Sequence, residues 1–398
     1  MSKKTKEIVV DLFCGAGGES QGIHWAAESQ DTEIELYAVN HWERAIETHS
    51  QNFPKDECLC RDIADLNPCR VIPHDHVSLL WASPACTHFS VARGGKPMDE
   101  QSRVTPFTVL DWLDKLTVDR VIIENVPEFQ SWGPLDADNR PNSEYKGATF
   151  DAFIAMMRSL GYYVDWRVLN AADYGAPTTR RRLFIQAVRR GCGKELLWPE
   201  QSHFPTLQKD ELFTQGNQWV PAREIIDWSI PKKGLLSREK PLKDSTIEKV
   251  IDGIRKYWTP TQCEPFIARY NSGRNRVHSI NEPLPTLDTS NRYALVEPIV
   301  MGYYGNATYT SVNQPLPTLT TKERFALLEG YSVDGKQVQD VSLRMLSVEE
   351  MQMAQSFPAS YRFAGSRADM VKQIGNAVCP KVAQALAHNA FGQGRWEA

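Results

Sequence analysis

The chain has 398 residues, of which 41% are hydrophobic, and a formal net charge of −4. This length allows a large core and indicates two domains, and the charge excludes a globally basic surface for nucleic acid. No signal peptide or transmembrane run is visible, which favours a cytoplasmic protein outside the membrane. The spacing of Cys58, Cys60, Cys69, His74 and His76 matches no standard zinc site, so we expect no metal.

The N-terminal segment predicts a strand, a glycine-rich turn and a helix. Glu7–Leu12 is mostly apolar, the turn follows at Phe13–Gly18, and a helix is expected from about Ser20. Such a turn lets backbone N–H groups and a helix N-terminus approach a ligand closely. The pattern F-x-G-x-G lacks the third glycine of a dinucleotide-binding turn, which favours a nucleoside site.

Two further predicted strands end in residues suited to adenosine. Leu36–Val39 is followed by Trp42, whose ring could stack on adenine. A weak third strand is followed by Asp62, whose carboxylate can accept a hydrogen bond from the adenine amino group. The order of the three signals indicates an adenosine-containing cofactor.

The fourth predicted strand, Val77–Leu80, leads into the segment Trp81–Ser90, W-A-S-P-A-C-T-H-F-S. Its Ser-Pro pair ends the strand and delivers Cys86 to a loop at the edge of the sheet. Arg93 and Lys96 follow, on either side of two glycines, so the loop is basic. This context favours a nucleophilic thiol, and the alternative is a cysteine that only packs in a turn.

The next elements add a carboxylate and three arginines. A helix is expected over 106–116, then a strand over Arg120–Ile123 that ends at Glu124, in the predicted ligand crevice. The alternative role for Glu124 is a cap on the next helix. After a helix over 149–160 and a strand over 162–169, Arg180-Arg181-Arg182 open the strand 183–188. Three arginines opening a core strand need a phosphate or a carboxylate partner.

Beyond Arg190 the β–α alternation stops, and an internal repeat follows. The unit Asn-x-Pro-Leu-Pro-Thr-Leu begins at Asn281 and again at Asn313, 32 residues later. Two copies are too few for a solenoid, so we predict a small, mostly β domain. Residues 342–387 return to a helical pattern, in which 372–378 are expected to open the last helix.

Together these motifs resemble the DNA (cytosine-5) methyltransferase family. Asp11–Gly17 is similar to its cofactor motif, Pro84-Ala85-Cys86-Thr87 to its P-P-C-Q nucleophile motif, and Glu124-Asn125-Val126 to its E-N-V motif. Thr178–Arg182 corresponds to Q-x-R-x-R, and Gly375–Val378 to the terminal G-N-A/S-V. Ala85 replaces a proline, Thr87 and Thr178 replace glutamines, and His41 stands where the family has a ribose-binding glutamate.

The resemblance implies an α/β fold with two parts. A Rossmann-like, S-adenosylmethionine-dependent methyltransferase sheet would occupy residues 1–190, completed by 339–398. A smaller, mostly β target-recognition domain would occupy 191–338, with the repeat at about 264–329. The activity implied is that of a DNA (cytosine-5-)-methyltransferase, active on double-stranded DNA in DNA methylation, either in a restriction-modification system beside an endonuclease or in phage protection. We expect a bacterial or phage-encoded monomer near the nucleoid.

By resemblance, the Cys86 thiolate attacks C6 of a cytosine that has left the stack, Glu124 holds N3, Arg182 contacts O2, and Arg180 orders the nucleophile loop. S-adenosylmethionine, which leaves as S-adenosylhomocysteine, would contact Asp11, Phe13, Gly15, Gly17, His41, Trp42, Asp62, Ile63, Pro84, Asn376 and Ala377. The candidate DNA contacts are Ser90, Arg93, Lys96, Arg274, Arg276, Arg292, Lys322 and Arg324. Alternatively, Arg292 and Arg324 hold their repeat units together.

Three other functions fit parts of this pattern. A tRNA cytosine-5 methyltransferase can share the architecture, but the large segment with a duplicated unit is better suited to reading duplex DNA. A non-catalytic, cofactor-sensing DNA-binding protein would be expected to lack Cys86 or Glu124, and both are present. A Rossmann oxidoreductase would need the third glycine of the turn.

Overall fold

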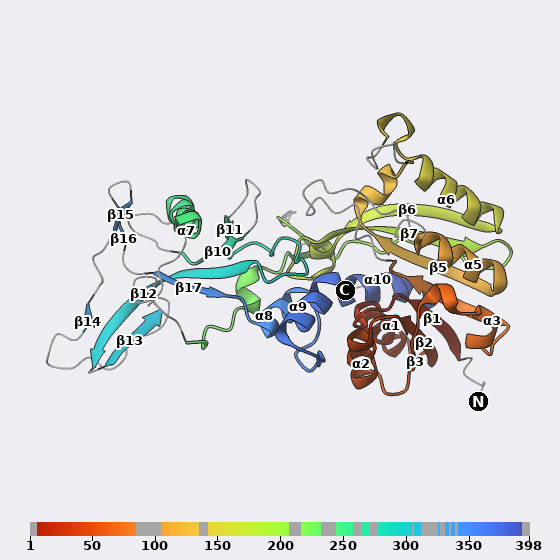
Figure 1. Cartoon of the computed structure of the whole chain (residues 1–398), viewed down its shortest axis with the longest axis horizontal. Coiled ribbons are helices and arrows are strands. Elements are labelled where there is room, and N and C mark those ends of the chain that lie inside the picture. Colours follow the sequence, from red (N-terminus) through yellow and green to blue (C-terminus); the bar gives the residue numbers. More distant parts are fainter. Residues whose placement is uncertain are drawn as a thin grey trace, which may run out of the picture.

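The computed structural model describes residues 6–84, 105–134, 142–206, 216–231, 244–257, 264–270, 277–304, 306–311, 325–326, 331–333, 336–338 and 341–391. Two sheets dominate this part of the chain, and the helices α8, α9 and α10 lie between them in the view of Figure 1. The larger sheet carries the N-terminal half, and the smaller one lies within residues 266–345.

The larger sheet has seven strands in the order β3-β2-β1-β4-β5-β7-β6. The five strands from β3 to β5 are parallel, whereas β7 runs antiparallel to both β5 and β6. The chain order reverses between β1 and β4, which is where open α/β sheets bind ligands, at the carboxyl ends of the strands. The strands are β1 Glu7–Leu12, β2 Ile34–Asn40, β3 Glu57–Cys60, β4 His76–Ala82, β5 Thr117–Asn125, β6 Tyr162–Asn170 and β7 Arg181–Arg189.

All the strands predicted for this half are present, most of them longer by one to three residues at an end. Three helices of the sheet were predicted, from about Ser20, over 106–116 and over 149–160, and they are present as α1 Gly18–Ser29, α5 Thr108–Lys115 and α6 Ala148–Ser159. The other helices of this part are α2 Glu43–Asn52, α3 Pro68–Val71 and α10 Pro380–Phe391. Short 3-10 helices occur at Ile63–Asp65, Thr105–Phe107, Pro127–Ser131, Ser143–Tyr145, Ala171–Tyr174 and Ala222–Ile225.

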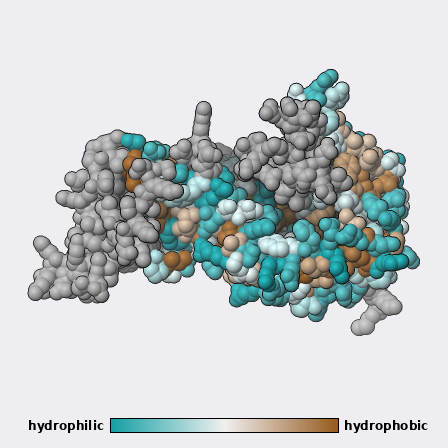
Figure 2. Space-filling view, in the orientation of Figure 1, coloured by the Kyte–Doolittle hydropathy of each residue, from teal (hydrophilic) through white to brown (hydrophobic). Residues whose placement is uncertain are grey.

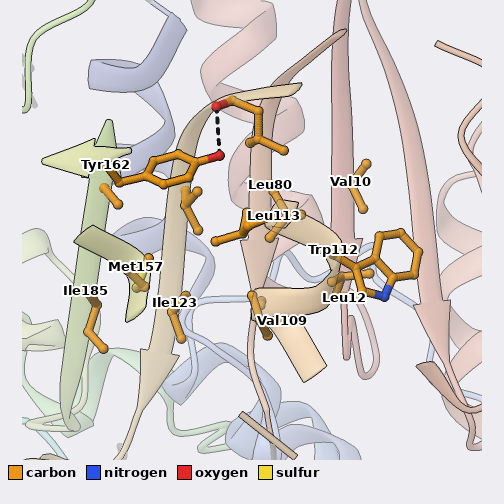
Figure 3. Packing of buried hydrophobic residues seen from close by; sticks show 14 of the residues in the cluster. Val10, Leu12, Leu80, Val109, Trp112, Leu113, Ile123, Met157, Tyr162 and Ile185 are labelled. Atoms are coloured by element: carbon orange, nitrogen blue, oxygen red, sulfur yellow. Dashed lines mark hydrogen bonds between the residues drawn. The ribbon is translucent and has the colours of Figure 1, made fainter. Parts of the chain in front are cut away.

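The central strands are buried on both faces, because neighbouring residues of a strand point to opposite sides of the sheet. Val10, Leu80 and Ile123 pack with residues of α5 and α6 on one face (Figure 3). Val9 and Leu79 pack with α1 and α10 on the other face. The apolar residues of the C-terminal helix α10 therefore complete the core of the N-terminal half.

The smaller sheet has six strands, with β11-β10-β12-β13 in sequence and with β14 and β17 also paired to β12. The strands are β10 Phe266–Arg269, β11 Val277–Ser279, β12 Tyr293–Tyr304, β13 Asn306–Ser311, β14 Phe325–Ala326 and β17 Val341–Met345. Two further pairs are β15 Tyr331–Val333 with β16 Lys336–Val338, and β8 His203–Phe204 with β9 Asn217–Gln218. Helix α7, Asp244–Tyr257, packs on the smaller sheet. This second part of the structure is mostly β, which confirms the predicted fold class.

The internal repeat of the sequence is also a repeat of strand pairing. In the first unit Ala268 pairs with Ala294 on one side and Val277 on the other. In the second unit Met301 pairs with Ala326 and Tyr309. Each unit is therefore a three-stranded antiparallel group with the same register, and the long strand β12 belongs to both.

Two expectations for the C-terminal part were wrong. Residues 342–345 are expected to be helical but belong to the strand β17, because they pair with the free side of β12 and bury Leu343 in the cluster that α7 also joins. The motif 372–378 does not open the last helix but ends α9, Arg367–Asn376, which follows α8, Val348–Ala354. Pro380 has no N–H to continue that helix and instead begins α10. The domain limits themselves remain a prediction.

On the face shown in Figure 2, hydrophilic residues predominate and hydrophobic ones form small groups. Among the described helices, none is both long enough and apolar enough to cross a membrane.

Candidate active site

The strand that leads to the predicted nucleophile ends inside the ligand crevice. Beyond β4, the Ser83 N–H donates to the carbonyl of Leu12 on β1 (3.0 Å), and Pro84 is buried. The Asn125 side chain on β5 donates to the Pro84 carbonyl (3.4 Å). Cys86, Ser90, Arg93 and Lys96 lie outside the described residues, so their predicted roles stay predictions. The chain nevertheless enters that segment between the carboxyl ends of β1 and β5.

A carboxylate and an arginine meet at this edge of the sheet. Glu124 lies near the end of β5 and Arg182 near the start of β7, and the two strands are hydrogen-bonded neighbours. Arg182 Nε is 3.0 Å from Glu124 Oε1, and the two side chains are 19% and 10% exposed. A nearly buried ion pair of this kind fixes the orientation of both side chains. The arginine therefore has a carboxylate partner, which is one of the two partners expected from sequence.

Arg180 is buried and donates hydrogen bonds to three backbone carbonyls. Its NH1 group lies 3.0 Å from the Gly375 oxygen and 3.3 Å from the Leu287 oxygen, and NH2 lies 3.4 Å from that of Asn376. Burial, followed by repulsion from Arg182, lowers the pKa of Arg180 to about 10. The side chain therefore joins the arginine motif to the terminal motif and to the first repeat unit. Its predicted contact with the nucleophile loop involves residues outside those described.

The first repeat unit also docks on the arginine motif through its backbone. The Thr179 N–H donates to the Leu284 carbonyl (2.7 Å), and the Leu284 N–H donates to the Pro177 carbonyl (3.0 Å). Leu284 and Leu287 are both buried. Sequence reasoning missed this contact, because nothing local to either segment indicates that residues more than 100 apart in the chain pair with each other.

The glycine-rich turn follows β1 as predicted, and three of its residues have positive φ angles. Phe13, Gly15 and Gly17 have φ angles of 62°, 51° and 79°. A Cβ on Gly17 would lie 2.8 Å from the Tyr361 hydroxyl, so the turn is packed tightly on that side. At Gly15, in contrast, a Cβ would meet no described atom within 4 Å except the Phe13 carbonyl at 3.9 Å. The turn therefore leaves open space beside Gly15, where a ligand can approach the backbone.

The end of β2 presents the side chains that were expected to meet adenosine. His41 is exposed and Trp42 is half-buried at the start of α2. The ammonium group of Lys372, on α9, lies 4.3 Å from the centre of the Trp42 ring. Asp62 is exposed and caps the short helix that begins at Ile63, which is buried. Lys372 was not predicted, because a single exposed lysine carries no sequence signal of its target.

A chain of hydrogen-bonded polar side chains joins the elements on either side of the glycine-rich turn. The Ser20 hydroxyl donates to Asp11 Oδ2, so it must accept the hydrogen bond from His49 Nε2 at 2.9 Å. Nδ1 of the same ring then accepts from the Cys58 thiol at 3.2 Å. Burial raises the pKa of Asp11 well above its usual range and lowers the pKa of His49 to about 3, with a smaller contribution from His24. Burial therefore favours the neutral form of both side chains.

The remaining predicted site residues are two expected to contact the cofactor and several expected to contact DNA. Asn376 is exposed and Ala377 is buried at the end of α9, beside the carbonyls that Arg180 contacts. Arg292 Nε lies 3.0 Å from Asp288 Oδ2, a contact within its own repeat unit. Such a contact is expected if Arg292 holds the unit together. The predicted DNA contacts Arg274, Arg276, Lys322 and Arg324 lie outside the described residues. Within the residues described, no group of three or more His, Cys, Asp or Glu could hold a metal ion.

The strand order and the polar groups at the carboxyl edge define an α/β protein with a ligand site at its switch point. Comparison with known proteins then shows the family: the model of the C-5 cytosine-specific DNA methylases matches residues 8–392, and the chain belongs to that family. The predicted enzyme class, DNA (cytosine-5-)-methyltransferase, is thereby confirmed.

Relatives match along almost the whole chain. Type II methyltransferase M.AgeI of Thalassovita gelatinovora is 25% identical over 439 residues, which cover 95% of this chain and 97% of that protein. Type II methyltransferase M.HhaI of Haemophilus parahaemolyticus is 26% identical over 383 residues, which cover 96% and 93%. A crystal structure of DNMT2 from Spodoptera frugiperda superposes with a TM-score of 0.57 at 19% identity, covering 97% of this chain and all of that one, and shares the fold.

Proposed function

We propose that this enzyme transfers a methyl group from S-adenosylmethionine to C5 of a flipped cytosine within a specific sequence of duplex DNA. The observation that carries this proposal is the ion pair of Glu124 and Arg182, 3.0 Å apart and nearly buried. It lies one strand away from the end of β4, which leads to Cys86. A carboxyl group and a guanidinium group paired at this edge suit the recognition of a polar, planar base.

In the proposed mechanism the Cys86 thiolate attacks C6 of cytosine, which makes C5 nucleophilic. Glu124 holds N3 and the exocyclic amine, so that charge developing on the ring is stabilised. Arg182 contacts O2 and keeps the Glu124 carboxyl group in place. After methyl transfer a base removes the C5 proton and the thiol leaves. The cytosine must leave the DNA stack to reach this edge of the sheet.

The open space beside Gly15 and the half-buried Trp42 fit S-adenosylmethionine. The residues that would hold the cofactor are Asp11, Phe13, Gly15, Gly17, His41, Trp42, Asp62, Ile63, Pro84, Asn376 and Ala377, among which Gly17 would meet its methionine end and Trp42 and Asp62 its adenine. When bound, this cofactor supplies an electrophilic methyl group. His41 replaces the usual ribose-binding carboxylate and can still bond a hydroxyl through a ring nitrogen.

In this proposal the bacterial or phage-encoded enzyme acts on DNA in the cytoplasm. The relatives named as type II methyltransferases support a role in restriction-modification, with an endonuclease as the functional partner. The second sheet and its duplicated unit would form the target-recognition domain within residues 191–338. A tRNA cytosine-5 methyltransferase can share this architecture, so transfer to tRNA is an outcome that the test must distinguish.

The test compares methyl transfer to unmethylated duplex DNA and to unmodified tRNA. We expect transfer to duplex DNA only, and its loss in Cys86→Ser, whereas the exposed thiol variant Cys69→Ser remains active. Duplex DNA containing 5-fluorocytosine should form a stable covalent adduct with wild type, because no C5 proton can leave. Transfer to tRNA alone, or an active Cys86→Ser enzyme, would contradict the proposal.

A further inference from the structure

The packed side of the glycine-rich turn is closed by a tyrosine from the C-terminal part of the chain, which has no part in the mechanism above. Tyr361 lies between α8 and α9, 345 residues after Ala16. Its buried hydroxyl donates a hydrogen bond to the carbonyl of Ala16, the residue between Gly15 and Gly17. A Cβ on Gly17 would lie 2.8 Å from the same hydroxyl, whereas the space beside Gly15 is open. Tyr361 therefore contacts the turn where it is packed, not where a ligand can approach it.

The hydrogen bond from Tyr361 fixes a peptide group that is also held at its other end. The Ala16 carbonyl and the Gly17 N–H belong to one planar peptide unit. The Gly17 N–H donates to the Cys14 carbonyl at 2.8 Å. Both polar groups of the unit are therefore engaged, and the unit cannot rotate without losing a hydrogen bond in the interior of the protein.

The glycines of the turn make such a contact necessary. Gly15 and Gly17 both have positive φ angles, but glycine populates positive and negative φ about equally well. A turn with two glycines therefore needs contacts from outside to stay in one conformation. A ligand that binds a turn already held in shape costs less conformational entropy on binding, and its affinity is higher for that reason.

The surroundings of Tyr361 hold its hydroxyl in place. Its backbone N–H donates to the Pro358 carbonyl at 3.0 Å, and its own carbonyl accepts from the Gln352 side chain at 3.3 Å. The centre of its ring lies 4.7 Å from that of Phe357 and 6.0 Å from that of Phe53. Burial raises the pKa of the Tyr361 hydroxyl well above its usual range, so the group keeps its proton and remains a donor. The tyrosine is therefore fixed independently of the turn that it contacts.

We propose that Tyr361 is a positioning residue for cofactor binding: its hydroxyl holds the peptide between Ala16 and Gly17, and with it the glycine-rich turn, in the conformation that receives S-adenosylmethionine. The inference rests on the proposed function, because it takes the turn as part of the S-adenosylmethionine site. Tyr361 acts through the backbone of the turn, so its loss should lower the affinity for the cofactor and leave the chemical step unchanged.

The test compares Tyr361→Phe with the matched control Tyr162→Phe. Tyr361→Phe removes only the hydroxyl and keeps the aromatic ring. Tyr162→Phe removes the same group from another buried tyrosine, whose hydroxyl donates to the Val118 carbonyl at 3.1 Å (Figure 3). That bond lies near the start of β5, at the edge of the sheet opposite the turn. The control therefore loses a comparable buried hydrogen bond without touching the turn.

The measurements are the affinity for S-adenosylmethionine by calorimetry, hydrogen exchange of residues 13–18 without cofactor, and the free energy of unfolding in urea. Tyr361→Phe should bind S-adenosylmethionine roughly 5- to 10-fold more weakly than wild type, the scale of one lost hydrogen bond, and residues 13–18 should exchange faster. At saturating cofactor its rate of methyl transfer should stay within about twofold of wild type. Tyr162→Phe should lose comparable stability in urea, yet bind the cofactor and exchange residues 13–18 as wild type does.

Unchanged affinity and exchange in Tyr361→Phe, or the same changes in both variants, would overturn the inference. A Tyr361→Phe protein that no longer folds would also overturn it, because the role of the hydroxyl would then be structural. A wild type that binds no S-adenosylmethionine would instead refute the proposed function, and the exchange of residues 13–18 would still decide whether Tyr361 holds the turn.

Discussion

The buried imidazole of His49 predicts that this enzyme loses stability in mild acid. Its Nδ1 accepts a hydrogen bond from Cys58 and its Nε2 donates to Ser20, so an added proton has no acceptor and the thiol contact is lost. Asp56 Oδ2, at 4.0 Å, is at the limit of an ion pair, and His24 already engages that carboxylate at 2.9 Å. The low pKa of about 3 therefore follows mainly from burial.

The sign and the size follow from linkage. The His49 pKa is about 3 in the folded protein and 6.5 in an ordinary environment, so below pH 6.5 the unfolded chain binds the proton more tightly. Stability contributed by the neutral ring is complete above pH 6.5 and falls as the pH drops from 6.5 toward 3. Each pH unit in that window costs about 1.4 kcal/mol, so pH 5.0 should cost roughly 2 kcal/mol of the free energy of unfolding.

The assay is urea denaturation at pH 7.0 and pH 5.0 for wild type, His49→Gln and His41→Gln. His49→Gln removes the titrating group, so acid should cost this variant about 2 kcal/mol less than it costs wild type. His41 is exposed, and its variant should behave as wild type. An equal loss on acidification in wild type and His49→Gln would refute the assignment of acid sensitivity to His49.

Three further predictions concern packing around the site. Gly17→Asp should abolish S-adenosylmethionine binding in calorimetry, because a Cβ there would lie 2.8 Å from a tyrosine hydroxyl and the φ of 79° is strained for any side chain; unchanged affinity would contradict the placement of the turn. Gly375→Ala should cost about 1–3 kcal/mol in thermal unfolding, since its Cβ would lie 2.1 Å from the Asp288 carbonyl oxygen; an unchanged melting temperature would show that the contact is loose. Arg344→Ala should lower the free energy of unfolding by roughly 3–5 kcal/mol, because the Glu350 carboxylate, 2.7 Å away, stays buried without its arginine partner. The double variant Arg344→Ala with Glu350→Gln should recover part of this loss.

Much of the larger sheet could be predicted from sequence because its strands are buried on both faces. Runs such as Glu7–Leu12 are short, apolar and bounded by turns, which is the pattern of a parallel core strand. Because carboxyl ends of parallel strands share one edge, placing Glu124 beside the end of β4 required only the order of the strands.

The features that were missed depend on contacts distant in sequence. Residues 341–345 form a strand only because β12 offers an edge there, and the docking of Leu284 on Thr179 joins two segments with no local signal. Glu19 looks like an ordinary acidic residue in the first turn of a helix, where acids are common. Glu19 is buried because α1 packs against elements distant in sequence, and composition alone could not show this.

The most direct test of the central claim is a mass-spectrometric analysis of nucleosides from unmethylated duplex DNA incubated with the enzyme and S-adenosylmethionine that carries a deuterated methyl group. The account predicts deuterated 5-methyl-2′-deoxycytidine, confined to cytosines in one sequence context, and none with Glu124→Ala or Cys86→Ser. Label on the N4 atom of cytosine or the N6 atom of adenine, or no label in DNA at all, would contradict it.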